Sequence, residues 1–239
     1  MKYIRFHWFT KGLPELLRKA ELKSWTYLEF LEQLTSSELK KREEKSIEKR
    51  LNWARFPYHR PIHMFRIEEQ DAISERQLKQ LREYEWLEQN YNLILLGPPG
   101  AGKTLLSVGI GIEAIHKGYQ VYFITMGELI QLLKTEEYVH KSKIQLKRLR
   151  ASDLVIIDDI MYMAMDQREA TLFFQLVHQL YEQSSLILTS NRSPEEWTEI
   201  VGNQGMMTAI LDRLLHRVEV IHMNNESHRL KNQQRIFKD

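Results

Sequence analysis

The chain has 239 residues, enough for one complete α/β domain and a small additional module. Hydrophobic residues make up 43% and charged residues 28%, as in a folded globular protein, and the formal net charge of +2 says little about nucleic-acid binding. The lack of cysteine excludes disulfides and thiolate metal sites, and no apolar stretch approaches the ~20 residues of a membrane span.

The first 60 residues are predicted to be helical. Leucine and tyrosine side chains recur every three or four residues between Leu13 and Leu34, which is the periodicity of an amphipathic helix. Residues 36–52 carry six basic and four acidic side chains with few large apolar ones. This composition is typical of a solvated helix with ion pairs one turn apart, and a surface for DNA or a partner chain is the alternative. No signal peptide is recognisable at the N-terminus, so a cytoplasmic protein without a membrane partner is expected.

A second domain is predicted after the linker prolines Pro57 and Pro61, so that a helical module of residues 1–58 precedes a domain of residues 59–239. Its first helix is expected over residues 74–89. Strands and helices then alternate, which predicts an α/β fold with a parallel sheet and right-handed crossovers. The predicted strands are 91–96, 120–125, 154–158, 186–190 and 218–222, and the predicted helices are 103–117, 127–134, 142–150, 166–183 and 208–216.

A glycine-rich loop follows the first predicted strand and fits the pattern G-x-x-x-x-G-K-[ST]. In such a loop, backbone N–H groups and the N-terminus of the next helix point at an anion. Lys103 would reach the β- and γ-phosphates of ATP, and the Thr104 hydroxyl would ligate Mg²⁺. A glycine turn without a ligand is the alternative. The predicted phosphate-binding residues are Gly97, Pro98, Pro99, Gly100, Ala101, Gly102, Lys103 and Thr104.

Two acidic residues end the third predicted strand, Leu154-Val-Ile-Ile-Asp158-Asp159. In a site that hydrolyses ATP, Asp158 would hold Mg²⁺ and Asp159 would orient or activate the attacking water. The alternative is that these acids cap the following helix. Asn191 ends the fourth predicted strand and would face the γ-phosphate if that strand lies between the first and the third. A turn-forming asparagine is the alternative there.

Arg213 lies in an amphipathic segment that runs from Ala209 to Arg217 and would be exposed at one end of the helix. An arginine in this place can stabilise charge on the γ-phosphate of ATP bound to a neighbouring subunit. A surface pair between Asp212 and Arg213 is the alternative.

Together, these motifs resemble the AAA+ ATPases of the initiator and helicase-loader branch, which includes DnaC. The resemblance rests on the phosphate loop, Ile-Ile-Asp-Asp, Leu-Thr-Ser-Asn-Arg, Ile-Leu-Asp-Arg-Leu and Glu226-Ser-His-Arg-Leu230. Within that branch, the chain is most similar to the IstB-type helper ATPases of insertion sequences. Because Leu28-Glu-Phe-Leu31 and Ala54-Arg-Phe-Pro57 match the module that precedes the ATPase in this family, the resemblance covers nearly the whole chain. It implies a P-loop AAA+ fold with a parallel five-stranded sheet flanked by helices and a small all-helical N-terminal module.

The resemblance also assigns roles to single residues. It implies that Asp158 and Asp159 are the Walker B pair, that Asn191 is sensor 1 and that Arg213 is the arginine finger. AAA+ proteins at large carry Asp-Glu at the Walker B position, so the shorter second carboxylate leaves the identity of the catalytic base open. Few residues follow the last predicted strand, so no C-terminal lid domain with a sensor 2 arginine is expected, and Arg229 is the candidate that replaces it in nucleotide binding.

A basic segment lies between the second and third predicted strands. In related initiators and loaders, the helices of this region line the assembly and contact DNA, so the resemblance implies sequence-independent contacts with DNA phosphates. A solvated basic helix is the alternative. The candidate DNA-binding residues are Lys141, Lys143, Lys147, Arg148 and Arg150.

The function that these observations favour is that of a DNA-binding ATPase that assists transposition. It would assemble head-to-tail as a homo-oligomer on duplex DNA, recruit or stimulate the transposase of the same element, and use ATP hydrolysis for disassembly. A DnaC-like loader of a replicative helicase is the alternative. A scaffold that binds nucleotide without hydrolysis is a third possibility, but such a scaffold needs no water-positioning groups.

Overall fold

The described part of the computed structural model comprises residues 9–60, 62, 73–160, 165–197 and 204–223. It forms two compact units, residues up to Arg50 and residues from Leu51 onward. The predicted domain boundary after residue 58 stays a prediction. Within the described residues, no helix is both long enough and apolar enough to cross a membrane.

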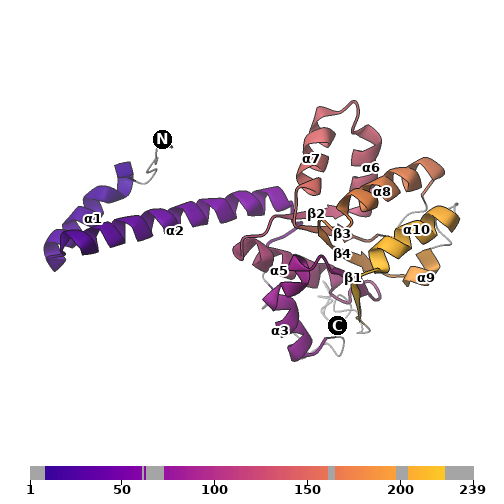
Figure 1. The fold of residues 1–239 in the computed structure, drawn as a ribbon, viewed down its shortest axis with the longest axis horizontal. Coiled ribbons are helices and arrows are strands. Elements are labelled where there is room, and N and C mark those ends of the chain that lie inside the picture. The colour runs from indigo at the N-terminus through magenta and orange to yellow at the C-terminus, as the bar shows by residue number, and fades with distance from the viewer. Residues whose placement is uncertain (1–8, 61, 63–72, 161–164, 198–203, 224–239) are drawn as a thin grey trace, which may run out of the picture. The chain divides into compact units, whose positions relative to one another are not determined.

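The first unit is built from two helices, α1 (Phe9–Lys23) and α2 (Tyr27–Ala54), and α1 lies back along the first part of α2 (Figure 1). Leu16 of α1 and Leu34 of α2 are buried. Ion pairs join side chains three or four residues apart along α2, such as Lys41 with Glu44 at 3.0 Å and Arg42 with Glu38 at 2.7 Å. These pairs agree with the prediction of a solvated, charged helix over residues 36–52.

The second unit contains a five-stranded parallel sheet with the strand order β2-β3-β4-β1-β5 (Figure 1). Each strand begins and ends within one residue of its prediction, so the predicted fold class is confirmed. The strands are β1 (Asn92–Leu96), β2 (Val121–Thr125), β3 (Leu154–Asp158), β4 (Ser185–Ser190) and β5 (Val218–His222).

Helices alternate with these strands as predicted, although several bounds differ; the helix expected over residues 208–216 spans Gln204–Leu215, and the helix expected over residues 166–183 spans Gln167–Leu180. The helix expected over residues 74–89 is divided at Tyr84, whose φ is 65° and whose hydroxyl donates to the Ile110 carbonyl at 2.8 Å. A short helix, α9 (Pro194–Trp197), was not predicted, although Ser193 followed by Pro194 is a usable signal for the start of a helix. The helices are α3 (Glu75–Glu83), α4 (Glu85–Glu88), α5 (Lys103–His116), α6 (Met126–Thr135), α7 (His140–Arg150), α8 (Gln167–Leu180), α9 (Pro194–Trp197) and α10 (Gln204–Leu215).

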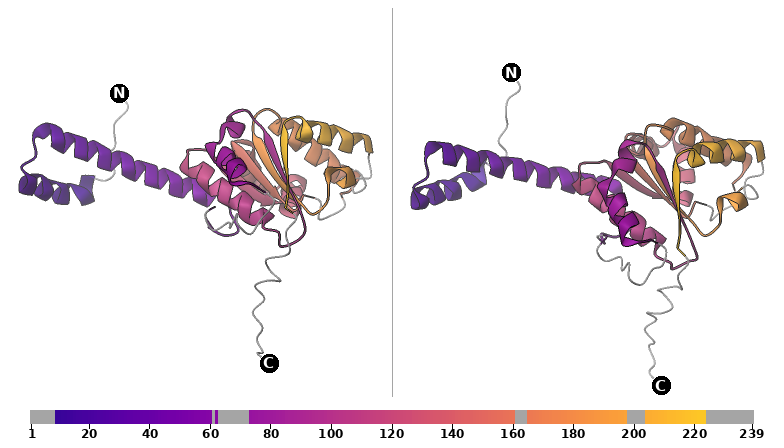
Figure 2. Two further views of the ribbon diagram at one scale, coloured as in Figure 1. Left: turned by 90° about the horizontal axis from the view of Figure 1, so that it is seen from below. Right: turned by 60° about the horizontal axis from the view of Figure 1, so that its bottom comes forward.

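The sheet is covered on both faces, which explains its continuous apolar strands (Figure 2). Successive side chains of a strand point to opposite faces. Val155 and Ile157 of β3 belong to the core formed with α6, α7, α8 and α10, whereas Ile156 approaches α5 at Gly111. The same alternation places Asp158 and Thr189 on the α5 face, and this determines which polar groups meet at the end of the sheet.

Candidate active site

The strand order brings the predicted nucleotide-binding residues to one edge of the sheet. In a parallel sheet the carboxyl ends of all strands lie at the same edge, where ligands of α/β proteins bind. Strand β4 lies between β1 and β3, which is the condition under which Asn191 was predicted to face the phosphate loop. The loop itself connects β1 with α5.

The phosphate loop has a backbone that only glycine tolerates at some positions. Gly97, Gly100 and Gly102 have φ values of 154°, 86° and 95°, a region that residues with a Cβ rarely adopt. A Cβ at Gly97 would also lie 2.2 Å from the Met223 carbonyl oxygen. Gly102 is the N-cap of α5 and has no side chain to cap the helix, so the start of α5 suits an anion.

Lys103 is buried beneath this loop, and only 6% of its surface is exposed. Its Nζ donates to the carbonyl oxygens of Gly97 and Pro98 at 2.7 and 3.0 Å and to Oδ1 of Asn191 at 2.7 Å. The lysine therefore connects the loop with the end of β4. Its ammonium group lies where it can exchange these acceptors for phosphate oxygens.

Asp158 is also buried, and both of its carboxylate oxygens accept hydrogen bonds from the Thr104 hydroxyl, at 3.0 and 3.1 Å. Burial raises the pKa of Asp158, and the neighbouring charge of Asp159 raises it further, while hydrogen bonds from Thr189 and Thr104 and the charge of Lys103 act in the opposite direction. A buried carboxylate facing a hydroxyl is a hard-oxygen donor set, and such donors fit Mg²⁺.

Asp159 differs from Asp158 in its exposure and its backbone. It is exposed at the sheet edge and has a φ of 54°, a left-handed conformation that aspartate tolerates better than most residues. Its N–H donates to the Thr189 hydroxyl at 2.9 Å. The same hydroxyl donates to Oδ1 of Asp158 at 2.6 Å, so Thr189 contacts both acidic residues.

The turn that carries Asn191 is held from the opposite face of the sheet. The Ser190 hydroxyl donates to the Arg192 carbonyl at 2.8 Å and accepts from the Arg192 N–H at 3.0 Å. The fully buried Trp197 donates from Nε1 to the same carbonyl at 3.0 Å. These contacts fix the backbone on both sides of Asn191, whose side chain lies beside Lys103.

Arg213 lies away from this site within its own subunit. The last turn of α10 is bonded to the start of β1, because the Asn92 side chain donates to the Leu214 carbonyl at 3.0 Å. Since β1 has five residues, this end of the sheet is about 17 Å from the phosphate loop. The Arg213 guanidinium lies 5.0 Å from the Phe174 ring centroid and donates to the Ala209 carbonyl at 2.8 Å.

The basic helix α7 contains cations in two different environments. Lys141, Lys143 and Lys147 are exposed. The Arg148 guanidinium lies 4.8 Å from the centroid of the Trp53 ring. Arg150 donates to both carboxylate oxygens of Glu136, at 2.5 and 2.8 Å, and to Oε1 of Gln179 at 2.7 Å.

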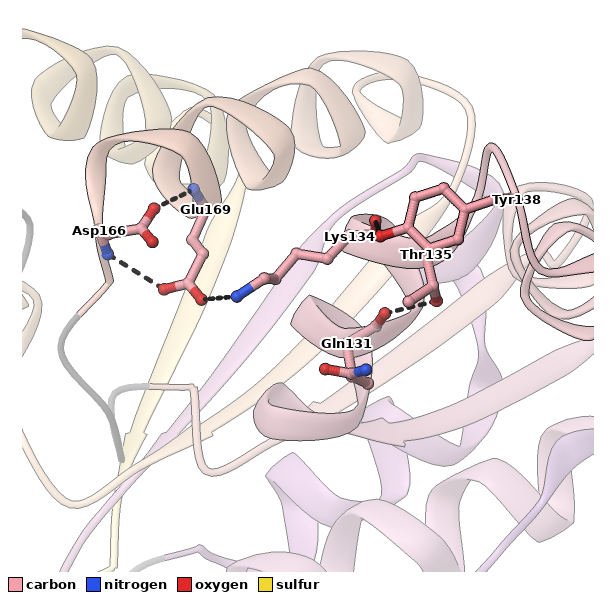
Figure 3. Close-up of polar contacts among 6 residues, drawn as sticks. All are labelled: Gln131, Lys134, Thr135, Tyr138, Asp166 and Glu169. Carbon is pink, nitrogen blue, oxygen red and sulfur yellow. Dashed lines mark hydrogen bonds and ion pairs between the residues drawn. The ribbon is translucent and has the colours of Figure 1, made fainter.

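An ion pair also joins α6 to the start of α8 (Figure 3). Lys134 Nζ lies 2.9 Å from Glu169 Oε1, and the other oxygen of Glu169 accepts from the Asp166 N–H at 3.0 Å. Asp166 in turn accepts from the Glu169 N–H at 2.8 Å, which completes a capping box at the N-terminus of α8. Together with the bond between Arg150 and Gln179, this pair connects the α6–α7 hairpin to both halves of α8.

Arg229 and Thr189 differ from the positions above, because one is not described and the other was not predicted. Arg229 lies outside the described residues. Thr189 was not singled out from the sequence, although a polar residue between apolar ones near the end of a buried strand was a usable signal. Its importance becomes visible only when the register places it opposite the end of β3.

Comparison with known proteins places these observations in a wider context. The chain matches the family of IstB-like ATP binding proteins over residues 1–236. It is 36% identical over 231 residues to a protein of Pseudomonas aeruginosa described as an ATP-binding protein of insertion sequence IS21, and the alignment covers 97% of this chain and 85% of that protein.

A helicase loader and a replication initiator are among the solved structures with a similar fold. The DnaC helicase loader has a TM-score of 0.51 at 20% identity, with 73% of this chain and 98% of that chain covered. AMPPCP-bound DnaA from Aquifex aeolicus has a TM-score of 0.50 at 23% identity, with 64% of this chain and 47% of that chain covered. At these identities the likeness concerns the fold alone, which is the P-loop AAA+ fold.

Proposed function

The chain belongs to the family of IstB-like ATP binding proteins, and we propose that it is an ATP-dependent helper of transposition that assembles on duplex DNA. The protein is an ATPase. In the proposed function, ATP-bound subunits associate on target DNA and recruit or stimulate the transposase of the same insertion sequence. Hydrolysis of ATP then releases the assembly.

The observation that carries this proposal is the meeting of three chain segments at one sheet edge. Lys103 contacts Asn191 at 2.7 Å, and Thr104 contacts Asp158 at 3.0 Å. In the proposed mechanism, Lys103 and the N-terminus of α5 bind the β- and γ-phosphates. A phosphate site alone needs neither Asn191 nor the acidic pair, so their convergence favours hydrolysis over binding only.

The two acidic residues have different roles in the proposed mechanism. Thr104 and the buried Asp158 would hold Mg²⁺, which would neutralise charge on the phosphate oxygens. The exposed Asp159 would accept a proton from the attacking water or orient it, and Asn191 would position that water near the γ-phosphate. Both residues lie at the ends of neighbouring strands, so their backbones are held by the sheet.

The trans role of Arg213 is supported by its position near the opposite end of the sheet. Since the last turn of α10 is bonded to the end of the sheet away from the phosphate loop, Arg213 would contact a γ-phosphate in another subunit. Such a contact joins unlike surfaces, which produces head-to-tail rings or helical filaments. ATP would then stabilise the subunit interface, and hydrolysis would weaken it.

DNA contact is proposed for the exposed lysines of α7. Phosphate contacts from Lys141, Lys143 and Lys147 would be independent of sequence and sensitive to salt. A few contacts in each subunit become a strong combined interaction when several subunits bind one duplex. ATP-dependent assembly and DNA binding are therefore coupled without any change in the affinity of a single subunit.

Sedimentation of the protein with duplex DNA of ~50–60 base pairs tests the proposal, since a site for several subunits needs several helical turns. Samples without nucleotide, with ADP and with ATP plus Mg²⁺ are compared for the wild-type chain and for Lys103→Ala. We expect large complexes only with ATP and only with the wild-type chain. DNA binding that is indifferent to nucleotide, or unchanged in Lys103→Ala, would contradict the proposal.

Loading of a replicative helicase is the alternative function. The likeness to DnaC concerns the fold, whereas the relative at 36% identity is a protein of an insertion sequence. A pull-down with the element's transposase and with a replicative helicase separates the two functions. Stoichiometric capture of the helicase, without capture of the transposase, would favour the loader.

A further inference from the structure

The Thr189 side chain lies between the two acidic residues at the end of β3. It is completely buried, and its hydroxyl contacts Asp158 Oδ1 at 2.6 Å and the Asp159 N–H at 2.9 Å. The backbone of Thr189 adds a further link, because its carbonyl accepts from the Ile160 N–H at 2.9 Å. One residue of β4 therefore contacts three consecutive residues at the end of the neighbouring strand.

The directions of these hydrogen bonds follow from the number of protons. A backbone N–H can only donate, so the Thr189 oxygen must accept from Asp159. A hydroxyl has a single proton, and the close carboxylate oxygen of Asp158 receives it. Thr189 is thus a donor toward the proposed Mg²⁺ ligand and an acceptor toward the residue proposed to orient water. No exchange of these roles is possible without breaking one of the bonds.

The backbone of Asp159 gives the contact a further purpose. Its φ of 54° lies in the left-handed region, which residues with a Cβ rarely adopt. Since the N–H of Asp159 is fixed on the buried Thr189 oxygen, the hydroxyl helps to hold this conformation. Asp159 is exposed and follows directly after β3, whose carboxyl end lies at the same edge of the sheet as the phosphate loop.

We propose that Thr189 is a positioning residue for ATP hydrolysis, which fixes the carboxylate of Asp158 and the backbone of Asp159 relative to each other. The inference rests on the proposed roles of those two residues in the ATPase. Thr189 itself does not touch the nucleotide or the attacking water in this assignment. Its removal should therefore impair the chemical step and leave nucleotide binding by the phosphate loop largely unchanged.

Thr189→Val is the most direct test, because valine has nearly the same shape and lacks the hydroxyl. We expect the kcat for ATP to fall by about tenfold to a hundredfold, as for the loss of hydrogen bonds to charged groups. The KM for ATP and the affinity for a fluorescent ADP analogue should stay within about twofold of wild type, because Lys103 and the phosphate loop are unchanged. Thr189→Ser keeps the hydroxyl and should retain kcat within about threefold.

Two outcomes would overturn the assignment. A wild-type kcat in Thr189→Val would show that the hydroxyl is dispensable. An equal loss of kcat and ADP-analogue affinity would show that the whole site had collapsed. Because a buried valine leaves the Asp159 N–H without an acceptor, the chain could also fail to fold. In that case Thr189→Ala replaces it, because the smaller side chain leaves room for a water that accepts from this N–H, and rescue by Thr189→Ser relative to alanine decides the question.

A double-mutant cycle with Asp159→Ala provides a readout that a merely structural role would not change. If Thr189 acts through Asp159, adding Thr189→Val to Asp159→Ala should lower kcat by much less than it does in the wild-type chain. Equal fold-losses in both backgrounds would overturn the inference. If the wild-type chain hydrolyses no ATP with or without DNA, the proposed function fails, whereas full activity in Thr189→Val rejects the Thr189 assignment alone.

Discussion

The carboxyl edge of the sheet and the outer helices α7 and α10 differ in what their polar side chains contact. At the edge, groups from three segments contact one another, as Lys103 does with Asn191 and Thr104 with Asp158. On the outer helices, the arginines contact aromatic, acidic or amide groups of their own chain, as Arg213 and Arg150 do. The contacts of the first region lie within one subunit, and the proposed functions of the second require another molecule.

This difference has a physical origin. The ends of parallel strands are brought together by backbone pairing, so polar residues at those ends meet whatever their side chains are. A cation on a surface helix has no such constraint, and it pairs with the nearest acceptor or ring. A count of basic residues in a helix therefore overestimates the number available to DNA.

The largest effect is expected for Arg213→Ala. If Arg213 acts on the ATP of a neighbour, the ATPase rate of the assembled protein should fall by about a thousandfold. ATP binding to the single subunit should be unchanged, because Arg213 lies near the far end of the sheet. Steady-state hydrolysis and ATP affinity of the isolated chain measure the two quantities. Arg217→Ala is the matched control, since Arg217 is an exposed arginine of the same region that contacts the Gln89 carbonyl.

Mixing two inactive variants makes this test sharper. Subunits with Lys103→Ala keep Arg213, and subunits with Arg213→Ala keep an intact phosphate loop. Their mixture should regain ATPase activity at the interfaces where an intact Arg213 of one subunit faces the intact phosphate loop of the other. Recovery would require trans action, whereas an inactive mixture or normal assembly of Arg213→Ala alone would contradict it.

The sequence predicted the fold and the nucleotide-binding edge more completely than it predicted the cation-bearing surfaces. Four largely buried strands, the edge strand β5 and the glycine loop are local signals, and the alternation of strands and helices determines the edge at which Lys103 and Asp158 meet. The contact of Thr189 with both acids depends on the register between β3 and β4, which no local pattern specifies. The pairing of Arg150 with Glu136 depends in the same way on the packing of α6 against α7.

A smaller effect is expected when the exposed lysines of α7 are removed. The double substitution Lys143→Ala and Lys147→Ala should weaken DNA binding by about tenfold and lower the slope of log affinity against log salt by about one for each lost contact in a subunit. Fluorescence anisotropy at several salt concentrations measures both quantities. Lys79→Ala on α3 removes an equally exposed charge outside this helix and should leave DNA binding unchanged. An unchanged salt slope in the α7 variant would show that DNA binds elsewhere.

The smallest effect is expected for Arg150, which separates a structural cation from a DNA-binding one on the same helix. Arg150→Ala should lower the free energy of unfolding by ~1 kcal/mol, because its bonds to Glu136 and Gln179 are lost in a partly exposed setting. Chemical denaturation measures this difference. The salt slope of DNA binding should change less than in the lysine variant. If Arg150→Ala changed the salt slope as much as the single substitution Lys143→Ala does, Arg150 would exchange its bond to Glu136 for one to a DNA phosphate.

The pH dependence of the stability lost in Arg150→Ala tests whether the ion pair between Arg150 and Glu136 causes it. The hydrogen bond from Arg150 lowers the pKa of Glu136 below its ordinary value of 4.5, so the pair stabilises the folded chain above that value. As the pH falls through the lower pKa of the folded state, Glu136 is protonated and the contribution disappears. The gap between wild type and Arg150→Ala should therefore be largest near pH 7 and should narrow below pH 4.5. Glu136→Gln should have the same reduced stability as Arg150→Ala at pH 7. The difference in stability between these two variants should not change with pH, because neither contains the pair. If the gap persisted at low pH, packing of the arginine stem rather than the ion pair would account for the stabilisation.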